Sequence, residues 1–240
     1  MENQMTFKRY EMKFLLNPVQ KEKILACMNG HMQLDRYGRS TIRNIYFDTD
    51  NYELIRHSME KPVYKEKMRI RSYKKINENE EVFVELKKKY DQVVYKRRIL
   101  CVEQDVKNYL YHGKSIQDTS QIGKEIQYFW EYYKNLCPKV FLSYDREAYY
   151  SLDNSDFRVT FDENILYRTN DLSLESDVYG TYILENGMTL MEIKTAGGIP
   201  LWLSTVLSKN HIYKTSYSKY GAAYIQMKTI KEAKGGRKYA

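Results

Sequence analysis

Charged side chains recur at every second position in several segments of this 240-residue chain. The segment from Lys65 to Arg71 has a cation at each of its four odd positions, while Met68 and Ile70 stand between them. Side chains of a strand point alternately to its two faces, so each such segment would have one charged and one apolar face. The same alternation is found at Arg9, Glu11 and Lys13, at Glu85 and Lys87, at Lys96 and Arg98, and at Glu192 and Lys194.

A charged strand face is either solvated or built to hold a polyanion, and solvation is the simpler explanation for any one segment. Like charges opposite one another on neighbouring strands are destabilising, however, unless an anion offsets them. Three carboxylates, Glu11, Glu85 and Glu192, stand at the same alternate positions as the cations. Magnesium or manganese prefers carboxylate and phosphate oxygens, and arginine and lysine bind the remaining phosphate oxygens. The pattern therefore indicates phosphate chemistry assisted by a metal.

Composition supports an acidic partner. The formal net charge is +8, which favours nucleic acid, an anionic membrane or a phosphorylated small molecule. The three cysteines are far apart and form no CxxC motif, so a reducing cytosol is the simpler environment. No run of about 18 apolar residues exists, and no membrane span is predicted. We therefore expect a cytoplasmic protein that reaches a membrane only peripherally, through a partner.

The alternating segments predict strands, and turn residues separate them. We predict strands over residues 6–15, 41–47, 63–74, 82–90, 93–101, 139–150, 156–162 and 188–195, with shorter ones near 165–168 and 178–184.

Helices are predicted where a cap or a 3.6-residue apolar period occurs. Asn17 and Pro18 form an N-cap and a first helical position, opening a helix that ends near residue 28. The other helices are expected over 48–55, 103–112 and 119–135, from 200 onward, and over about 216–227.

Strands outnumber helices, and short turns join most of them, which favours a curled antiparallel sheet with helices outside. About eight strands are enough to close a barrel. A barrel with the charged faces inside would be a hydrated, basic tunnel. We predict an α+β fold, with a single domain over residues 1–227 and a basic, frayed tail over 228–240.

Eight short motifs extend this prediction, because their order along the chain is that of a known family. Over about residues 6–225 the chain resembles the VTC domain, the polyphosphate polymerase branch of the triphosphate tunnel metalloenzymes in the CYTH-like superfamily. The motifs are Arg9-Tyr10-Glu11-Met12-Lys13-Phe14, Tyr46-Phe47-Asp48-Thr49, Lys67-Met68-Arg69-Ile70-Arg71, Val84-Glu85-Leu86-Lys87, Tyr144-Asp145-Arg146, Phe157-Arg158-Val159-Thr160, Leu190-Met191-Glu192-Ile193-Lys194 and Ser218-Lys219-Tyr220.

The resemblance implies an eight-stranded tunnel in which basic residues bind triphosphate or a growing polyphosphate. It implies catalytic cations at Lys13, Arg69, Arg71, Arg146 and Arg158. It also implies phosphate contacts from Lys87, Lys96, Ser218 and Lys219, and the alternation adds Arg9, Lys67 and Lys194. The assignment of Lys96 depends on register, because Arg97 and Arg98 adjoin it and a slip by one residue exchanges the faces.

By resemblance, Glu192 holds the divalent metal, Mn²⁺ or Mg²⁺. The alternation makes Glu11 and Glu85 further candidate metal ligands, but each could equally pair with a neighbouring cation. Hydrolases and cyclases of the wider superfamily begin with Glu-x-Glu-x-Lys, whereas this chain has Arg9-x-Glu11-x-Lys13. The exchange of a carboxylate for a cation favours holding phosphate over activating water.

These residues together predict a polyphosphate polymerase. The terminal oxygen of a polyphosphate chain is already an anion, so a site rich in cations and poor in bases suits phosphate as the acceptor. The expected ligands are ATP or another NTP and polyphosphate or pyrophosphate, and the resemblance allows a separate membrane protein as partner. The alternatives are a tripolyphosphatase or NTP γ-phosphate hydrolase, and a non-catalytic module that binds polyphosphate or RNA. Nucleic acid is disfavoured because Tyr10 and Tyr95 fall on the faces opposite the cations.

Overall fold

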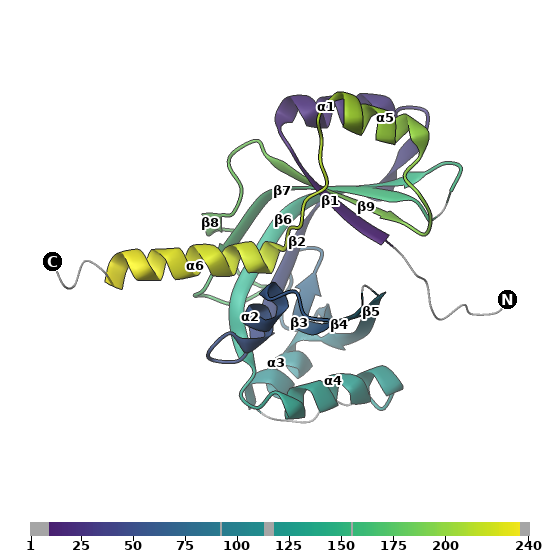
Figure 1. Ribbon diagram of the computed structural model, residues 1–240. Coiled ribbons are helices and arrows are strands. Elements are labelled where there is room, and N and C mark those ends of the chain that lie inside the picture. Colours follow the sequence, from purple (N-terminus) through teal and green to yellow (C-terminus); the bar gives the residue numbers. More distant parts are fainter. Residues whose placement is uncertain (1–9, 92, 113–117, 155, 236–240) are drawn as a thin grey trace. The chain divides into compact units, whose positions relative to one another are not determined.

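The computed structural model describes residues 10–235 except 92, 113–117 and 155 (Figure 1). Within this part of the chain it contains both helices and a large antiparallel sheet, which confirms the α+β fold. The strands are β1 (Tyr10–Leu16), β2 (Met32–Asp48), β3 (Tyr64–Ser72), β4 (Glu81–Tyr90), β5 (Val93–Val102), β6 (Cys137–Ser151), β7 (Arg158–Arg168), β8 (Thr181–Tyr182) and β9 (Thr189–Thr195). The helices are α1 (Pro18–Met28), α2 (Glu53–Met59), α3 (Glu103–His112), α4 (Gln121–Tyr132), α5 (Leu201–Lys209) and α6 (Lys219–Gly235).

The strands pair in the order β1-β9-β7-β6-β2-β3-β4-β5, and β8 pairs with β7. The meander β3-β4-β5 follows the chain order, as the short turns between these strands predicted. Strand β1, by contrast, pairs with β9 from near the end of the chain. The pairing order has β1 and β5 at its ends, and closure of the sheet into a tunnel stays a prediction.

Several boundaries differ from those predicted. Strand β2 begins at Met32, well before the predicted position, and β7 continues through the short strand expected near 165–168. Helix α2 begins only at Glu53, because Tyr52 has a left-handed backbone with φ 59°. The Asp48 carboxylate then accepts the N–H groups of Leu54 and Ile55 at 2.9 and 3.0 Å.

Residues 228–235 of the predicted tail continue helix α6, and the frayed tail stays a prediction. Lys228 and Glu232, four residues apart, form an ion pair of 3.8 Å that supports this last part of the helix. Residues 236–240 of the predicted tail and residues 6–9 of the predicted first strand lie outside the described residues.

The chain divides into two compact units. Unit 1 comprises residues 1–41, 144–165 and 184–217, and unit 2 comprises residues 42–143, 166–183 and 218–240. A single domain over 1–227 stays a prediction.

The core of unit 1 lies between its sheet and two helices. Phe14, Phe161 and Met191 project from β1, β7 and β9 into one buried cluster. Helices α1 and α5 lie side by side over this cluster (Figure 1). At the start of α1, the Asn17 side chain accepts the N–H of Gln20 at 2.8 Å and completes a capping box, as the N-cap predicted.

The core of unit 2 uses the apolar positions of the meander. Met68 on β3, Leu86 on β4 and Ile99 on β5 belong to one buried cluster, together with Val106 of α3 and Phe129 of α4. Helices α3 and α4 therefore cover the apolar face of β4 and β5. The opposite face of the meander carries Lys67, Arg69, Glu85, Lys87, Lys96 and Arg98. In the described part of the chain, no helix combines the length and the apolar character needed to cross a membrane.

Candidate functional site

A row of side chains crosses four strands on the charged face of unit 2. Tyr46 of β2 stands opposite Arg69 of β3, Arg69 opposite Glu85 of β4, and Glu85 opposite Arg98 of β5. Residues opposite one another in a sheet have neighbouring side chains. These four residues are called the arginine row below.

Three lysines form the adjacent row on the same face. Lys67 of β3 stands opposite Lys87 of β4, and Lys87 opposite Lys96 of β5. The register thus places Lys96 on the charged face, whereas Arg97 lies on the other face and donates to Glu125 at 3.0 Å. Three opposed lysines repel one another, so this lysine row has a favourable place for several negative charges.

Glu85 is the anion at the centre of these cations. Its carboxylate accepts from Arg69 Nε at 2.9 Å and from Arg98 Nε at 2.8 Å, and it pairs with Lys96 Nζ at 2.7 Å. Arg71 Nε lies 3.9 Å away. Burial raises the pKa of Glu85, but Arg69, Arg71 and Lys96 lower it more strongly, so the pKa lies well below its usual range. Glu85 is therefore ionised, and its contacts favour an ion-pair role over metal binding.

The substitution Glu85→Gln is expected to lower the free energy of unfolding by roughly 3–5 kcal/mol, because it leaves several cations without their buried counter-charge. Tripolyphosphate should restore part of this loss by replacing the missing negative charge. Denaturant unfolding of both proteins with and without tripolyphosphate measures the effect. The matched control is Glu81→Gln, at an exposed position of the same strand. Equal stability of the wild type and Glu85→Gln would contradict the ion-pair role.

Further polar contacts hold the cations of unit 2 in place. Arg71, which is 5% exposed, donates from Nε to Asn44 Oδ1 at 2.8 Å. Lys67 Nζ donates to Ser218 Oγ at 3.1 Å, and Ser218 Oγ also accepts the N–H of Gly221 at 3.1 Å in the first turn of α6. Ser218 thus lies beside the lysine row, and its neighbour Lys219 is buried.

In unit 1, two shorter rows cross β1, β9 and β7. Lys13 stands opposite Glu192, and Glu192 opposite Thr160. The second row contains Glu11, Lys194 and Arg158. The alternation in the sequence therefore brings these predicted residues onto one face of unit 1.

The Lys13 ammonium group lies between two carboxylates. Its Nζ is 3.2 Å from Glu11 Oε1 and 3.6 Å from Glu192 Oε1, and it donates to the Tyr217 carbonyl at 2.9 Å. Glu192 itself is only 6% exposed. Two carboxylates that converge on one cation form a place where positive charge is stabilised.

The carboxylate of Asp162 holds the guanidinium group of Arg146 in position. Its Nε and Nη2 each donate to the Asp162 carboxylate at 2.6 Å, in the bidentate geometry that orients a guanidinium group. Arg146 Nη2 also reaches Glu192 Oε2 at 3.4 Å. Arg158 is less constrained, because its side chain is 49% exposed and lies 3.7 Å from Asp35.

The residues around Glu192 fit a metal whose other ligands come from substrate. The described residues contain no group of three or more His, Cys, Asp and Glu side chains arranged to hold a metal. Magnesium commonly needs only one or two carboxylates, because phosphates and water complete its coordination. Glu192 and Glu11 supply two carboxylates here. The buried Thr160 hydroxyl, which has no hydrogen-bond partner among the described residues, adds an oxygen donor in the same row as Glu192.

Five residues of these clusters, including Thr160, were not assigned a role from the sequence. Tyr46, Asn44 and Arg98 stand on the charged face of unit 2, and Asp162 orients Arg146 in unit 1. Strand alternation had already placed Arg98 with Lys96 on a charged face, but no ligand role was assigned to it. The predicted phosphate ligand Arg9 lies outside the described residues.

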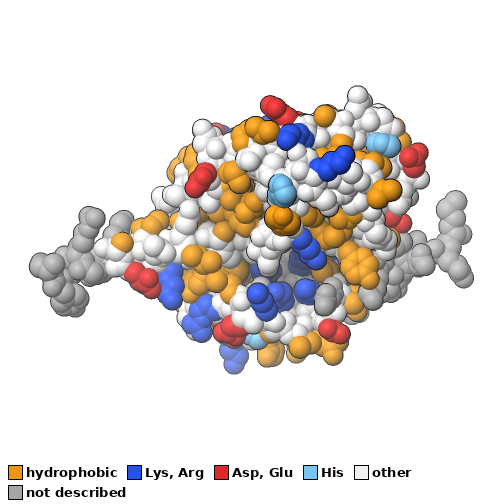
Figure 2. Space-filling view, turned by 45° about the horizontal axis from the view of Figure 1, so that its top comes forward, with side chains coloured by type: hydrophobic (Ala, Val, Ile, Leu, Met, Phe, Trp, Pro, Cys, Tyr) orange, Lys and Arg blue, Asp and Glu red, His pale blue; other side chains and the backbone are white. Residues whose placement is uncertain are grey.

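Basic residues are also visible on the outside of the molecule. Figure 2 shows lysine and arginine side chains (blue) at several places among apolar ones (orange) on one face.

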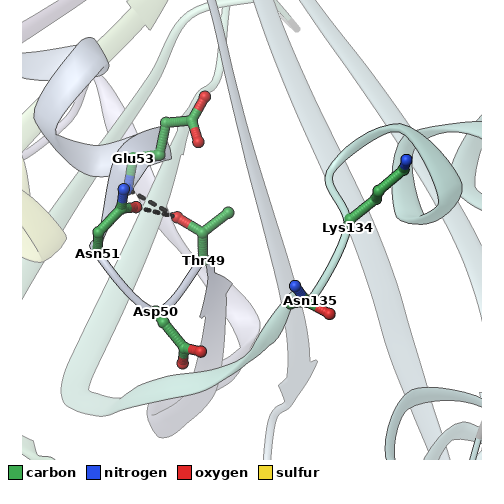
Figure 3. Close-up of a pocket in the computed structure, with 6 residues that line it drawn as sticks. All are labelled: Thr49, Asp50, Asn51, Glu53, Lys134 and Asn135. Atoms are coloured by element: carbon green, nitrogen blue, oxygen red, sulfur yellow. Dashed lines mark hydrogen bonds between the residues drawn. The ribbon is translucent and has the colours of Figure 1, made fainter.

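A pocket of about 290 Å³ elsewhere in unit 2 contains none of the predicted site residues. In Figure 3 its hydrogen bonds join Thr49 to Asn51 and to the backbone of Glu53, which are contacts within one turn. Asp50 forms an ion pair with Lys139 at 2.7 Å. The pocket is lined by Thr49, Asp50, Asn51, Glu53, Lys134 and Asn135.

Comparison with solved structures shows which proteins share this fold. A protein from Bacillus halodurans, described as a candidate adenylate cyclase, is 13% identical with a TM-score of 0.53, over 89% of this chain and 94% of its own. A Hippeastrum protein, described as a candidate adenylyl cyclase with a dominant triphosphatase activity, is 14% identical with a TM-score of 0.52, over 88% of this chain and 93% of its own. At these identities the likeness is one of fold.

No curated protein matches the sequence. The family model of the VTC domain, by contrast, matches residues 8–228, which include the strands and clusters described above. The chain therefore belongs to the VTC domain family.

Proposed function

We propose that this protein is a polyphosphate polymerase, which transfers the γ-phosphoryl group of an NTP to the end of a polyphosphate chain. ATP is the first candidate for the NTP. The observation that carries the proposal is the lysine row beside the arginine row in unit 2. Lys67, Lys87, Lys96, Arg69, Arg71 and Arg98 are six cations, and Glu85 is the carboxylate that pairs with four of them.

Repeated cations on adjacent strands suit a ligand with repeated charges. Lysine binds phosphate as a point charge, and the planar guanidinium of arginine donates two hydrogen bonds in parallel. A triphosphate or polyphosphate presents anionic oxygens on successive phosphorus atoms, so it can contact both rows at once. A ligand with a single carboxylate could contact only one or two of these cations at a time.

The chemistry of the rows also favours a phosphate acceptor. Phosphoryl transfer depends on alignment and on neutralising the charge of the transferred group. An attacking phosphate oxygen is already ionised at neutral pH and needs no general base. The two rows supply positive charge, and neither contains a histidine.

In unit 1, we assign Glu192 as the main metal ligand, with Glu11 and Thr160 as further oxygen donors. A divalent ion, Mn²⁺ or Mg²⁺, would there neutralise charge on phosphate oxygens. Lys13 and Arg146 hold the Glu192 carboxylate in position and add two positive charges that bind phosphate. Association with a separate membrane protein stays a prediction.

A hydrolase is the second candidate, because the fold relative from Hippeastrum is described with a triphosphatase activity. The deciding experiment incubates the purified protein with ATP, Mn²⁺ and a short polyphosphate primer, followed by gel analysis. A polymerase gives lengthened polyphosphate and ADP, and a hydrolase gives free phosphate. Binding without turnover would identify a polyphosphate sensor and contradict the proposal. Reactions without metal and with Arg97→Ala, on the opposite face of β5, are the controls.

Polyphosphate binding is expected to weaken as the pH rises above about 8. Partial burial lowers the pKa of Lys96 to about 8, with Arg98 and Arg69 also lowering it and Glu85 opposing the shift. Below this pH the ammonium group is already charged, and above it each binding event must also take up a proton. Affinity should then fall by up to about tenfold per pH unit. The measurement is calorimetric titration with tripolyphosphate from pH 7 to 9.5.

Lys96→Arg is the matched variant, because arginine remains charged over this whole range. Its affinity should depend on pH less steeply than that of the wild type. Identical profiles for the two proteins would show that Lys96 does not titrate with the ligand.

A further inference from the structure

Tyr46 lies at the end of the arginine row, and nearly all of its side chain is buried. It is 7% exposed, and its hydroxyl accepts a hydrogen bond from Arg69 Nη1 at 2.8 Å. A phenol can accept and donate at the same time. Among the described residues, none accepts the proton of the Tyr46 hydroxyl. The row thus contains a buried hydroxyl whose proton is available to an oxygen of a ligand.

The surroundings of this hydroxyl are cationic. Burial by itself raises the pKa of Tyr46, but the charges of Arg69, Arg71 and Lys219, with the hydrogen bond from Arg69, outweigh it and lower the pKa. An O–H proton among cations is stabilised when an anion approaches it. The same cations attract the anion to this place.

The ring of Tyr46 is held by a chain of contacts that ends in the backbone. It stacks on Tyr220, with ring centroids 4.7 Å apart and planes at 21°. The Tyr220 hydroxyl donates to Asp48 Oδ2 at 2.9 Å, and Asp48 is fixed by the N–H groups of Leu54 and Ile55. The Tyr46 hydroxyl therefore has a defined position before any ligand binds, which lowers the entropic cost of using it.

We propose that the Tyr46 hydroxyl donates a hydrogen bond to an oxygen of a phosphate bound at the arginine row. Tyr46 is then a substrate-binding residue, with Arg69 and Tyr46 contacting the same phosphate group. The proposal rests on the proposed function, since it takes a triphosphate or polyphosphate as the ligand. Tyr220 is a positioning residue that acts through the Tyr46 ring.

A double-mutant cycle distinguishes this role from that of a residue that only holds Arg69. The proteins are the wild type, Tyr46→Phe, Arg69→Ala and the double variant, each titrated calorimetrically with tripolyphosphate in the absence of metal. A hydrogen bond to a charged group predicts that Tyr46→Phe weakens binding about 10-fold. The weakening should persist in the Arg69→Ala background, because the hydroxyl contacts phosphate directly.

The control is Tyr95→Phe, which removes a hydroxyl from the opposite face of β5 and should bind like the wild type. A second measurement uses the wild-type protein labelled isotopically at tyrosine Cζ. The NMR signal of Tyr46, assigned by its absence in Tyr46→Phe, should shift when tripolyphosphate is added.

Three results would overturn the inference: equal affinity of Tyr46→Phe and the wild type, loss of the effect in the Arg69→Ala background, or an unchanged Tyr46 signal at saturating ligand. A wild type that does not bind tripolyphosphate would contradict both the inference and the proposed function. Binding without turnover would contradict only the polymerase, and the affinities of Tyr46→Phe and the wild type would still decide the inference.

Discussion

Arg69→Ala is expected to lower the rate of phosphoryl transfer by a factor of about 10³–10⁵, the range found for arginines that stabilise a transferring phosphoryl group. Arg69 is the best placed cation for this test, because it contacts both Tyr46 and Glu85 in the arginine row. Its loss leaves Glu85 paired with Arg98 and Lys96, so the buried carboxylate keeps counter-charges. The stability of the fold should therefore change much less than turnover.

The measurement combines ADP release under saturating ATP and primer with denaturant unfolding. Arg97→Ala, on the other face of β5, should keep nearly normal turnover. Near-normal turnover of Arg69→Ala would instead indicate a solvated strand face. Arg71→Ala should lower the rate similarly, but its interpretation is less direct, since Arg71 is buried and bonded to Asn44.

Glu192→Gln is expected to remove the activity that depends on a divalent metal while leaving metal-free binding of polyphosphate intact or tighter. The amide is a poor metal ligand compared with a carboxylate, and the substitution also removes one negative charge beside Lys13 and Arg146. Titration of turnover against Mn²⁺ in the wild type and the variant measures the first effect, and calorimetry without metal measures the second.

Glu22→Gln, at an exposed position of α1, is the control and should keep the metal dependence of the wild type. If Glu192→Gln also kept it, Glu192 would be a counter-charge for Lys13 and Arg146, and another residue would have to hold the metal.

The strands of the meander could be predicted closely because charged and apolar residues alternate over part of β3 and β4, from Lys67 to Arg71 and from Val84 to Lys87. What a single strand does not encode is its register, which arises only when strands pair. The sequence therefore left open whether Lys96 or Arg97 joins the charged face. It also gave no sign that Arg69, Glu85 and Arg98 stand in one row with Tyr46.

Sequence patterns failed to predict some other parts of the structure, and the reason lies in the local sequence or in contacts that form only on folding. The early part of β2 is polar and contains Gly38 with φ +56°, so it lacks the alternation that predicts a strand. Helix α6 was predicted to end near residue 227, because a basic tail follows, and the pairing of Lys228 with Glu232 supports helix beyond that point. Asp162 has no signal in the sequence, because its role exists only through contact with Arg146.

The ion pairs of Glu85 also have a consequence for which ligands the protein selects. A carboxylate tethered beside its cations competes with any incoming anion at a high effective concentration. A monovalent anion would have to displace the Glu85 carboxylate through a single contact. A chain of phosphates would also contact Lys67 and Lys87, so it would lose a smaller share of its binding free energy when one contact opens. The affinity of the meander for an anion should then rise with the number of negative charges that the anion carries. Long chains should outcompete chloride and orthophosphate in the salt of a cell, where a simple basic surface would be screened.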